Sequence, residues 1–285
     1  MESNPRSSRP SGRALLFTRP VSSATAPHRP PPQDRSAALR LAVLPALLLG
    51  LWFLAAQQGW LNPYLLPAPQ TVWAAALELA DSGRLVQHIS ASTSRVLGGF
   101  LLASALALPL ALWLALAPRA AAWLHLPLEF LRVVPPLALI PVLILWFGIG
   151  EPAKLAVVVL SSFFPIFLNA LNGLRTTDPR LLELGDSLEL APLERLRHIQ
   201  LPASLPATLT GLRLGFGYAW RALVGAELIA APAGLGFLIG ESAEMARTDL
   251  VFVSIFTIAV LGVLADVLFV RLTQRLAPWS KDLRS

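Results

Sequence analysis

Residues 96–117, VLGGFLLASALALPLALWLALA, contain no charged side chain. The hydrocarbon core of a bilayer is about 30 Å thick, and a helix of about 20 apolar residues crosses it. This stretch therefore predicts a transmembrane helix. Five further mainly apolar stretches lie along the chain: 41–56, 133–150, 155–174, about 206–230 and 250–270. Their succession predicts an all-α fold, a polytopic membrane bundle of about six transmembrane helices.

The composition of the whole chain agrees with a membrane protein. Of its 285 residues 55% are hydrophobic and 14% charged, and the mean hydropathy is +0.61. Soluble domains carry roughly 25% charged residues, so this chain has too few charges to cover a surface that faces water. The composition excludes an ordinary soluble enzyme. The chain has no cysteine and its four histidines are scattered, so we expect no metal ligand and no catalytic residue.

The N-terminal segment differs from the rest of the chain. The first 40 residues carry seven arginines against two acidic residues, and they are rich in proline. Such a segment has too little apolar area to offset the entropy lost on ordering. We expect a disordered basic cytoplasmic tail over 1–38, a transmembrane domain over 39–279 and a short cytoplasmic tail over 280–285.

The distribution of the basic residues indicates an orientation. Six spans place both termini on one side, and with that side cytoplasmic the inner segments hold sixteen Lys and Arg residues against three in the outer segments. Cytoplasmic loops carry such an excess. The net charge of +6 is therefore interpreted as a topology signal and not as nucleic-acid binding. We expect a multi-pass protein of the bacterial cytoplasmic (inner) membrane, in contact with the lipid bilayer, with both termini in the cytoplasm.

The inner segment over 176–204 is long, carries charges of both signs, and repeats its leucines at near-helical spacing. This pattern predicts two short amphipathic helices with a break at Ala191 and Pro192, because proline suits a first helical turn. Pro202 and Pro206 are expected to end the second helix before the next span. Such a pair of helices either covers the inner face of the bundle or forms a docking surface for a cytosolic partner.

The spacing of three runs, at 183–185, 189 and 199–202, resembles the EAA loop of importer-type ABC transporter permeases. That loop reads Glu-Ala-Ala, three residues, Gly, nine residues, Ile-x-Leu-Pro. The runs at 130–141 and 145–150 resemble the sulfonate, taurine and nitrate branch of the same family, and the aliphatic-sulfonate permeases most of all. The resemblance extends over roughly residues 60–279.

The resemblance implies that the segment 176–204, called here the coupling segment, docks on a cytosolic ATPase. The residues that carry the motif, and so the expected contact, are Glu183, Leu184, Gly185, Glu189, Ile199, Leu201 and Pro202. The resemblance also implies two copies of an ABC ATPase subunit, a homodimer of this chain, and a separate periplasmic or extracellular substrate-binding protein. The chain has no Walker A pattern, so we expect the partner to use the ATP and this chain to have no cofactor.

Two parts of the motif depart from the family pattern. Leu184 and Gly185 stand where the family has its two alanines. The family has glycine where this chain has Glu189, and glycine adopts positive φ at little cost. We expect Glu189 to be unable to make that turn. The turn then moves to 190–192, or the first helix continues.

Three charged residues lie in or beside the spans and are candidates for the translocation pathway: Arg132, Arg221 and Glu227. An ionisable group in a span costs at least a few kcal/mol, so it faces the bundle interior or water. Arg221 has two interpretations. Its guanidinium attracts an anionic solute, or it forms an ion pair between helices, with Asp266 as one possible partner.

Small residues and prolines predict local features of the bundle. Gly211 and Gly215 form a spacing that permits close helix packing. Prolines at 135, 136, 141 and 165 are expected to bend or interrupt the third and fourth spans.

Taken with the resemblance, these features indicate the membrane permease subunit of an ATP-driven importer for a small anionic solute, an aliphatic sulfonate or taurine. A permease of the same type for nitrate or another small solute is the alternative. An ATPase-independent transporter is disfavoured because no internal repeat is evident. A membrane enzyme is disfavoured because the serines within the spans have no histidine in a neighbouring span and no pair of aspartates occurs there.

Overall fold

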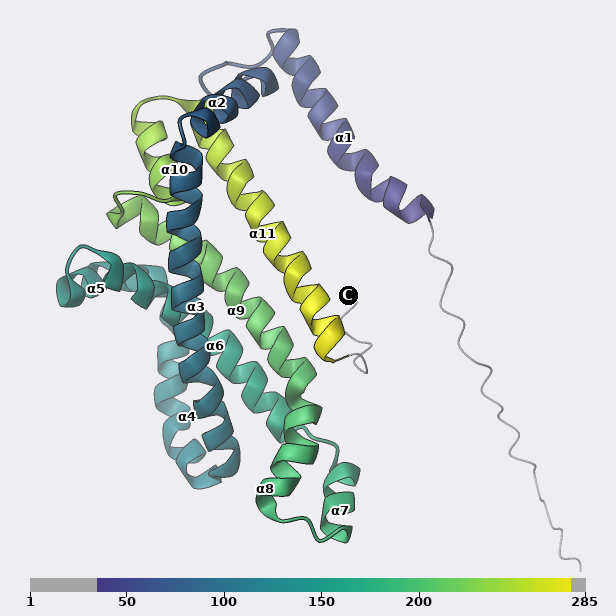
Figure 1. Cartoon of the computed structure of the whole chain (residues 1–285). Coiled ribbons are helices and arrows are strands. Elements are labelled where there is room, and N and C mark those ends of the chain that lie inside the picture. The colour runs from purple at the N-terminus through teal and green to yellow at the C-terminus, as the bar shows by residue number, and fades with distance from the viewer. Residues whose placement is uncertain (1–34, 278–285) are drawn as a thin grey trace, which may run out of the picture. The chain divides into compact units, whose positions relative to one another are not determined.

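The computed structural model describes the backbone of residues 35–277 and the side chains of residues 43–229 and 231–277. The expected tails over 1–38 and 280–285 lie outside the described residues, except for residues 35–38. Every regular element in the described part of the chain is a helix (Figure 1), which confirms the all-α prediction. The elements are α1 (Arg35–Gln57), α2 (Pro69–Asp81), α3 (Arg84–Leu116), α4 (Pro118–Val133), η1 (Pro136–Leu139), α5 (Ile140–Phe147), α6 (Glu151–Arg175), α7 (Pro179–Ser187), α8 (Pro192–Arg195), η2 (Leu196–Gln200), α9 (Leu201–Ala230), α10 (Leu235–Glu244) and α11 (Thr248–Leu276).

The chain divides into two units, residues 1–49 and 50–285. What is described of the first unit is the N-terminal part of α1, which is apolar from Val43 onward. The second unit holds the end of α1 and all the other helices.

Three helices of the second unit, α3, α6 and α11, are long and apolar enough to cross a membrane. Helix α4 and the η1–α5 segment meet the same criterion together, as a pair bent by 84°. The bend follows Val134, where Pro135 and Pro136 cannot continue the α4 hydrogen-bond pattern. The predicted interruption by prolines is thus confirmed for the third span. In the fourth span the chain is not interrupted, because α6 continues through Pro165, and a bend there stays a prediction.

Helix α9 contains 30 residues, a length of about 45 Å. Two glycines bring its backbone close to α6. A Cβ atom added to Gly211 would lie 2.7 Å from the Cβ of Asn169, and one added to Gly215 would lie 2.6 Å from the Cγ1 of Ile166. The close packing predicted from this glycine spacing is confirmed, and it occurs within the chain.

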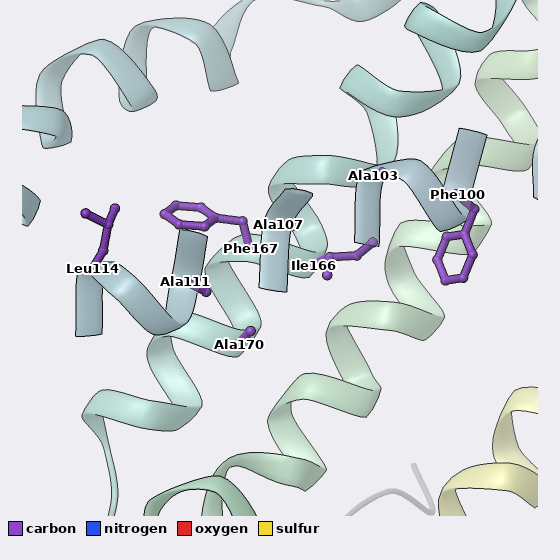
Figure 2. Close-up of a cluster of buried hydrophobic side chains, with 8 residues drawn as sticks. All are labelled: Phe100, Ala103, Ala107, Ala111, Leu114, Ile166, Phe167 and Ala170. Carbon is purple, nitrogen blue, oxygen red and sulfur yellow. The ribbon is translucent and has the colours of Figure 1, made fainter. Parts of the chain in front are cut away.

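Helix α3 packs on the same helix, α6, through small residues. Ala103, Ala107 and Ala111 are completely buried and face Ile166 and Phe167 of α6 (Figure 2). Alanine at every fourth position forms a smooth stripe that lets two helices approach closely. Helix α6 is therefore packed between α3 and α9, and these three helices form the centre of the second unit.

The coupling segment connects the C-terminus of α6 to the N-terminus of α9. Near that junction a Cβ atom added to Gly173 would lie 2.8 Å from the Cβ of Ala207 and 3.1 Å from the carbonyl oxygen of Ser204. The close contact holds the two helices together where the coupling segment is attached, at the end where Figure 1 shows α7 and α8.

Candidate functional site

The first helix of the coupling segment, α7, has well-defined ends. At its start the Asp178 carboxylate accepts a hydrogen bond of 2.9 Å from the backbone N–H of Arg180. Pro179 occupies the first helical position, where its missing N–H has no cost. At its end the backbone N–H of Leu190 donates to the carbonyl oxygen of Gly185 at 3.1 Å, the bond that closes a helix with a left-handed residue.

Glu189 is that left-handed residue, with φ of +52°. The expectation that the turn would move away from Glu189 was wrong. The hydrogen bond at Leu190 and the start of the next helix at Pro192 fix the chain on both sides of the turn. These contacts outweigh the cost of a side chain in the left-handed region, about 1–2 kcal/mol. The glutamate therefore adopts the conformation for which the family uses glycine.

The second helix begins where it was predicted but does not end there. The Glu194 carboxylate accepts a hydrogen bond of 3.0 Å from the backbone N–H of Ala191, and α8 begins at Pro192. The expectation that Pro202 and Pro206 would end this helix was wrong, since α8, η2 and α9 follow one another without a break. The π-helical turn η2 ends at Gln200, two residues before Pro202, and its wider hydrogen-bond spacing helps the helix accommodate a residue without an N–H.

The two helices of the coupling segment pack on each other through Gly185. A Cβ atom added to this buried glycine would lie 2.8 Å from the Cδ1 of Ile199 and 3.3 Å from the Cδ of Arg195. Arg195 also donates to the carboxylate of Asp186 at 2.5 Å. Gly185 and Ile199, two of the predicted coupling residues, thus hold the segment together.

The opposite face of the coupling segment is exposed. Three leucines have more than half of their surface accessible: 53% for Leu184, 62% for Leu188 and 73% for Leu193. The other predicted coupling residues that are exposed are Glu183, Glu189, Leu201 and Pro202. An acidic residue among exposed leucines, on helices attached to α6 and α9, can bind the groove of a partner protein.

A cavity of about 550 Å³ lies where the broken α4–α5 pair meets α6 and α9. Two of the predicted pathway residues line it, Arg132 from α4 and Arg221 from α9. Ser161 and Asn169 of α6 add a hydroxyl and an amide to a lining that is otherwise mainly apolar. Two guanidinium groups can bind the oxygens of a small anion.

Arg221 is exposed, and its guanidinium carbon lies 5.8 Å from the centre of the Tyr218 ring. Within residues 43–277 no carboxylate oxygen lies within 4.0 Å of its guanidinium group. Asp266 instead accepts two hydrogen bonds from Arg213, at 2.6 and 2.8 Å. The suggested pair between Arg221 and Asp266 was wrong, because Arg213, about two turns earlier on α9, binds both oxygens of that carboxylate.

Arg132 is the second candidate that lines the cavity, and it does have an acidic partner. Its Nε donates to the carboxylate of Glu129, one turn earlier on α4, at 2.6 Å. Both side chains are partly accessible, 48% for Arg132 and 41% for Glu129. Glu129 was not among the predicted site residues, although its spacing of three residues from Arg132 favours such a pair on a helix.

Glu227, the third candidate, does not line this cavity. Its side chain is completely buried and accepts hydrogen bonds from Ser92 at 2.8 and 3.0 Å, from Arg95 at 2.7 Å and from the backbone N–H of Gly236 at 3.0 Å. Glu227 therefore joins α3, α9 and the first turn of α10. The structure places it in a structural network and not beside Arg132 and Arg221.

The same network continues to α6 through residues that the sequence analysis did not select. Arg95 donates to both carboxylate oxygens of Glu151, at 2.7 and 2.8 Å, and Lys154 donates to one of them at 2.7 Å. The side chain of Lys154 is 2% exposed. A lysine one turn after a glutamate is a local signal for a pair, but nothing in the sequence connects this pair to Arg95.

Comparison with known proteins gives consistent matches. The family model described as "Binding-protein-dependent transport system inner membrane component" matches residues 107–278. A permease protein SsuC of Bacillus subtilis (strain 168), named for aliphatic sulfonates transport, is 36% identical over 256 residues, 90% of this chain and 92% of its own. The taurine transport system permease protein TauC of Escherichia coli (strain K12) is 34% identical over 258 residues, 89% of this chain and 94% of its own. The SsuC protein of Escherichia coli (strain K12) is 40% identical over 224 residues, 79% of this chain and 85% of its own.

Proposed function

We propose a function from one premise: the chain belongs to the family of binding-protein-dependent transport system inner membrane components. It is accordingly a permease component of an ABC importer, a helical protein that crosses the membrane several times. The solute, the partners, the number of copies and the orientation given below are our proposals.

The exposed face of the coupling segment is the observation that carries the proposal. Leu184, Leu188 and Leu193 are exposed on short helices that connect α6 to α9. An apolar helical face outside the spans has no lipid to cover it, so it needs a protein partner. We propose that this partner is a cytosolic ABC ATPase subunit and that Glu183 pairs with a basic group in its groove.

The attachment of the coupling segment explains how the ATPase would act on the permease. The α6–α9 contact at Gly173, Gly211 and Gly215 leaves no space for the two helices to slide past each other. A movement of the coupling segment would therefore move α6 and α9 together as a rigid pair. Two ATPase subunits, one for each copy of a permease homodimer, would supply this movement by ATP hydrolysis.

The proposed solute is a small organic anion with a sulfonate group. Arg132 and Arg221 line a cavity of about 550 Å³, and a guanidinium group binds the oxygens of such an anion through charge-assisted hydrogen bonds. The names of the relatives, one for taurine and two for aliphatic sulfonates, support this class of solute. A separate substrate-binding protein would deliver the solute to the outer side.

The proposed orientation places the coupling segment and both termini in the cytoplasm. Sixteen basic residues lie in the segments assigned to the inner side and three in those assigned to the outer side. Helices α1 and α9 complete the six spans, together with α3, the α4–α5 pair, α6 and α11.

Transport by the reconstituted complex tests the proposal. The permease, its ATPase and its binding protein would be placed in proteoliposomes, and uptake of radiolabelled taurine, ethanesulfonate or nitrate would be measured with ATP inside. We expect uptake of the two sulfonates that stops when ATP is replaced by a non-hydrolysable analogue. Uptake of nitrate alone would replace the sulfonate assignment, and uptake independent of the ATPase would overturn the importer function.

The role of Glu183 in the coupling segment can be tested by comparing a charge reversal at this residue with a control substitution elsewhere. Glu183→Lys is expected to lower ATP-dependent uptake at least tenfold. Arg119→Gln, on the exposed start of α4, is expected to transport at the unmodified rate. Equal uptake by both variants would contradict the proposed role of Glu183.

A further inference from the structure

A second cavity extends the first one along α6. It has a volume of about 250 Å³, and the two cavities share Arg132, Phe164 and Leu168 in their linings. Together they border α6 from Leu160 to Arg175, a distance of about 22 Å. The two cavities thus form one groove between α4 and α6, which runs toward the end of α6 that carries the coupling segment.

Polar and ionisable side chains follow this groove from one end to the other. Arg221 lies in the first cavity and Arg132 at the junction, and Arg175 lies at the far end of the second cavity. The second cavity also contains His125, Glu129 and Asn172. Ionisable groups in a membrane protein do not face hydrocarbon, because water or protein must solvate them. Water or protein therefore surrounds these groups, and the groove carries three cations along its length.

Glu129 occupies the position in this groove where such an anion would meet Arg132. Its carboxylate accepts the hydrogen bond from the Nε of Arg132 at 2.6 Å. A sulfonate would accept the same bond. Since both side chains of the pair are more than 40% exposed, water screens their attraction and the pair can exchange partners readily.

We propose that Glu129 is an internal counter-ion that competes with the solute for Arg132. A sulfonate that moves from Arg221 displaces the Glu129 carboxylate and binds Arg132. The return of the carboxylate then releases the sulfonate toward Arg175. The pair keeps the affinity of the route low, which transport requires because a tightly held solute would not leave. This inference rests on the proposed function and adds to it the residue that releases the solute.

Opposite effects of two substitutions test the proposal. Binding of ethanesulfonate to the purified permease–ATPase complex, without binding protein, would be measured by saturation-transfer NMR. We expect Glu129→Gln to bind at least threefold more tightly than the unmodified complex, because Arg132 loses its competitor. Arg132→Gln is expected to bind at least threefold more weakly. Arg119→Gln, also on α4 but outside the groove, should bind as the unmodified complex does.

If the Glu129–Arg132 pair has only a structural role, a different result is expected. Both substitutions break the same ion pair, so they would then change the affinity in the same direction or leave it unchanged, and either result would overturn the proposal. No detectable binding by the unmodified complex would overturn it as well. Uptake in proteoliposomes of the same preparation distinguishes failure of the Glu129 proposal from failure of the proposed function. If ATP-driven sulfonate uptake is normal but the two substitutions do not change the affinity in opposite directions, only the role of Glu129 is refuted. Loss of sulfonate uptake by the unmodified complex refutes the proposed function itself.

Discussion

Glu227 of α9 and Arg95 of α3 form an ion pair of 2.7 Å in which the glutamate side chain has no exposed surface and the arginine side chain only 9%. The remaining hydrogen-bond capacity of the carboxylate is used by Ser92 and by the backbone N–H of Gly236. The turn at Gly234 also depends on this arrangement, since a Cβ atom there would overlap the Glu227 carboxylate. The carboxylate therefore joins two long helices and the first turn of α10.

Removal of the Glu227 charge should destabilise the protein strongly. In Glu227→Gln the buried guanidinium of Arg95 keeps its ion pair with Glu151 but loses the negative charge of Glu227, its fully buried partner. Breaking a buried pair from one side costs about 3 kcal/mol or more, because the remaining charge cannot return to water. We expect a clearly lower thermal unfolding midpoint of the detergent-solubilised protein.

A more exposed pair, between α3 and α10, is the control for this prediction. Glu241 pairs with Arg84 at 2.9 Å, and their side chains are 26% and 49% exposed. Glu241→Gln should lower the free energy of unfolding by less than about 1 kcal/mol. Equal shifts of the midpoint for the two variants would show that burial of the Glu227 pair is unimportant.

Filling the contact between α6 and α9 should also destabilise the protein. In Gly215→Leu the new side chain collides with Ile166 and with the carbonyl oxygen of Ser162, 2.6 and 3.1 Å from the added Cβ. Overpacking of this kind costs about 2 kcal/mol. Gly217 has no atom within 4 Å of an added Cβ, so Gly217→Leu should have little effect on the thermal midpoint. A similar loss at both positions would contradict the close contact.

The sequence predicts the helices and the coupling segment because both depend on local patterns. The uncharged run at 96–117 is sufficient for a membrane helix, and the repeated leucines around 181–199 are sufficient for short amphipathic helices. The buried network depends on no local pattern. Arg95 lies 56 residues from Glu151 and 132 residues from Glu227, so only the packing of α3 on α6 and α9 brings them together.

The conformational preference of a single residue was misleading where hydrogen bonds of its neighbours determine the backbone conformation. Glutamate disfavours positive φ, yet the closing bond at Leu190 holds Glu189 in the turn. Pro202 was expected to end a helix, yet the π-helical turn before it lets the chain continue into α9. In each case the position was identified correctly and its conformation was not, because the neighbouring hydrogen bonds outweigh the preference of one residue.

The exposed leucines of the coupling segment should be necessary for binding the ATPase. Leu188→Asp places a charge on the face proposed to enter the partner's groove. We expect the amount of ATPase that co-purifies with the membrane-extracted permease to fall at least tenfold. Leu65→Asp alters a leucine that is 76% exposed in a segment assigned to the opposite side, and it should keep the ATPase bound. Retention of the ATPase by both variants would exclude this face as the docking surface.

Glycine at the Glu189 position should stabilise the turn. Glu189→Gly removes the side chain from a left-handed backbone, so local opening of the coupling segment should cost about 1 kcal/mol more. Slower amide hydrogen exchange in peptides that cover 178–200 would report this gain. Glu183→Gly, inside α7, should have the opposite effect: the free energy of local opening should fall by about 1 kcal/mol, and exchange should be faster. Faster exchange in both variants would mean that φ at Glu189 is not strained.

The proposed orientation can be tested directly, because the chain contains no cysteine and a single introduced thiol is a unique reporter. Ser187 at the end of α7 and Ser82 after α2 are both exposed, and the two are assigned to opposite sides of the membrane. A membrane-impermeant maleimide should label Ser82→Cys in spheroplasts and Ser187→Cys in inside-out vesicles. Because sixteen basic residues are assigned to the inner side and three to the outer side, inversion would bring the larger group across the membrane against the usual bias. The reverse labelling pattern would therefore invalidate the orientation and, with it, access of the coupling segment to a cytosolic ATPase.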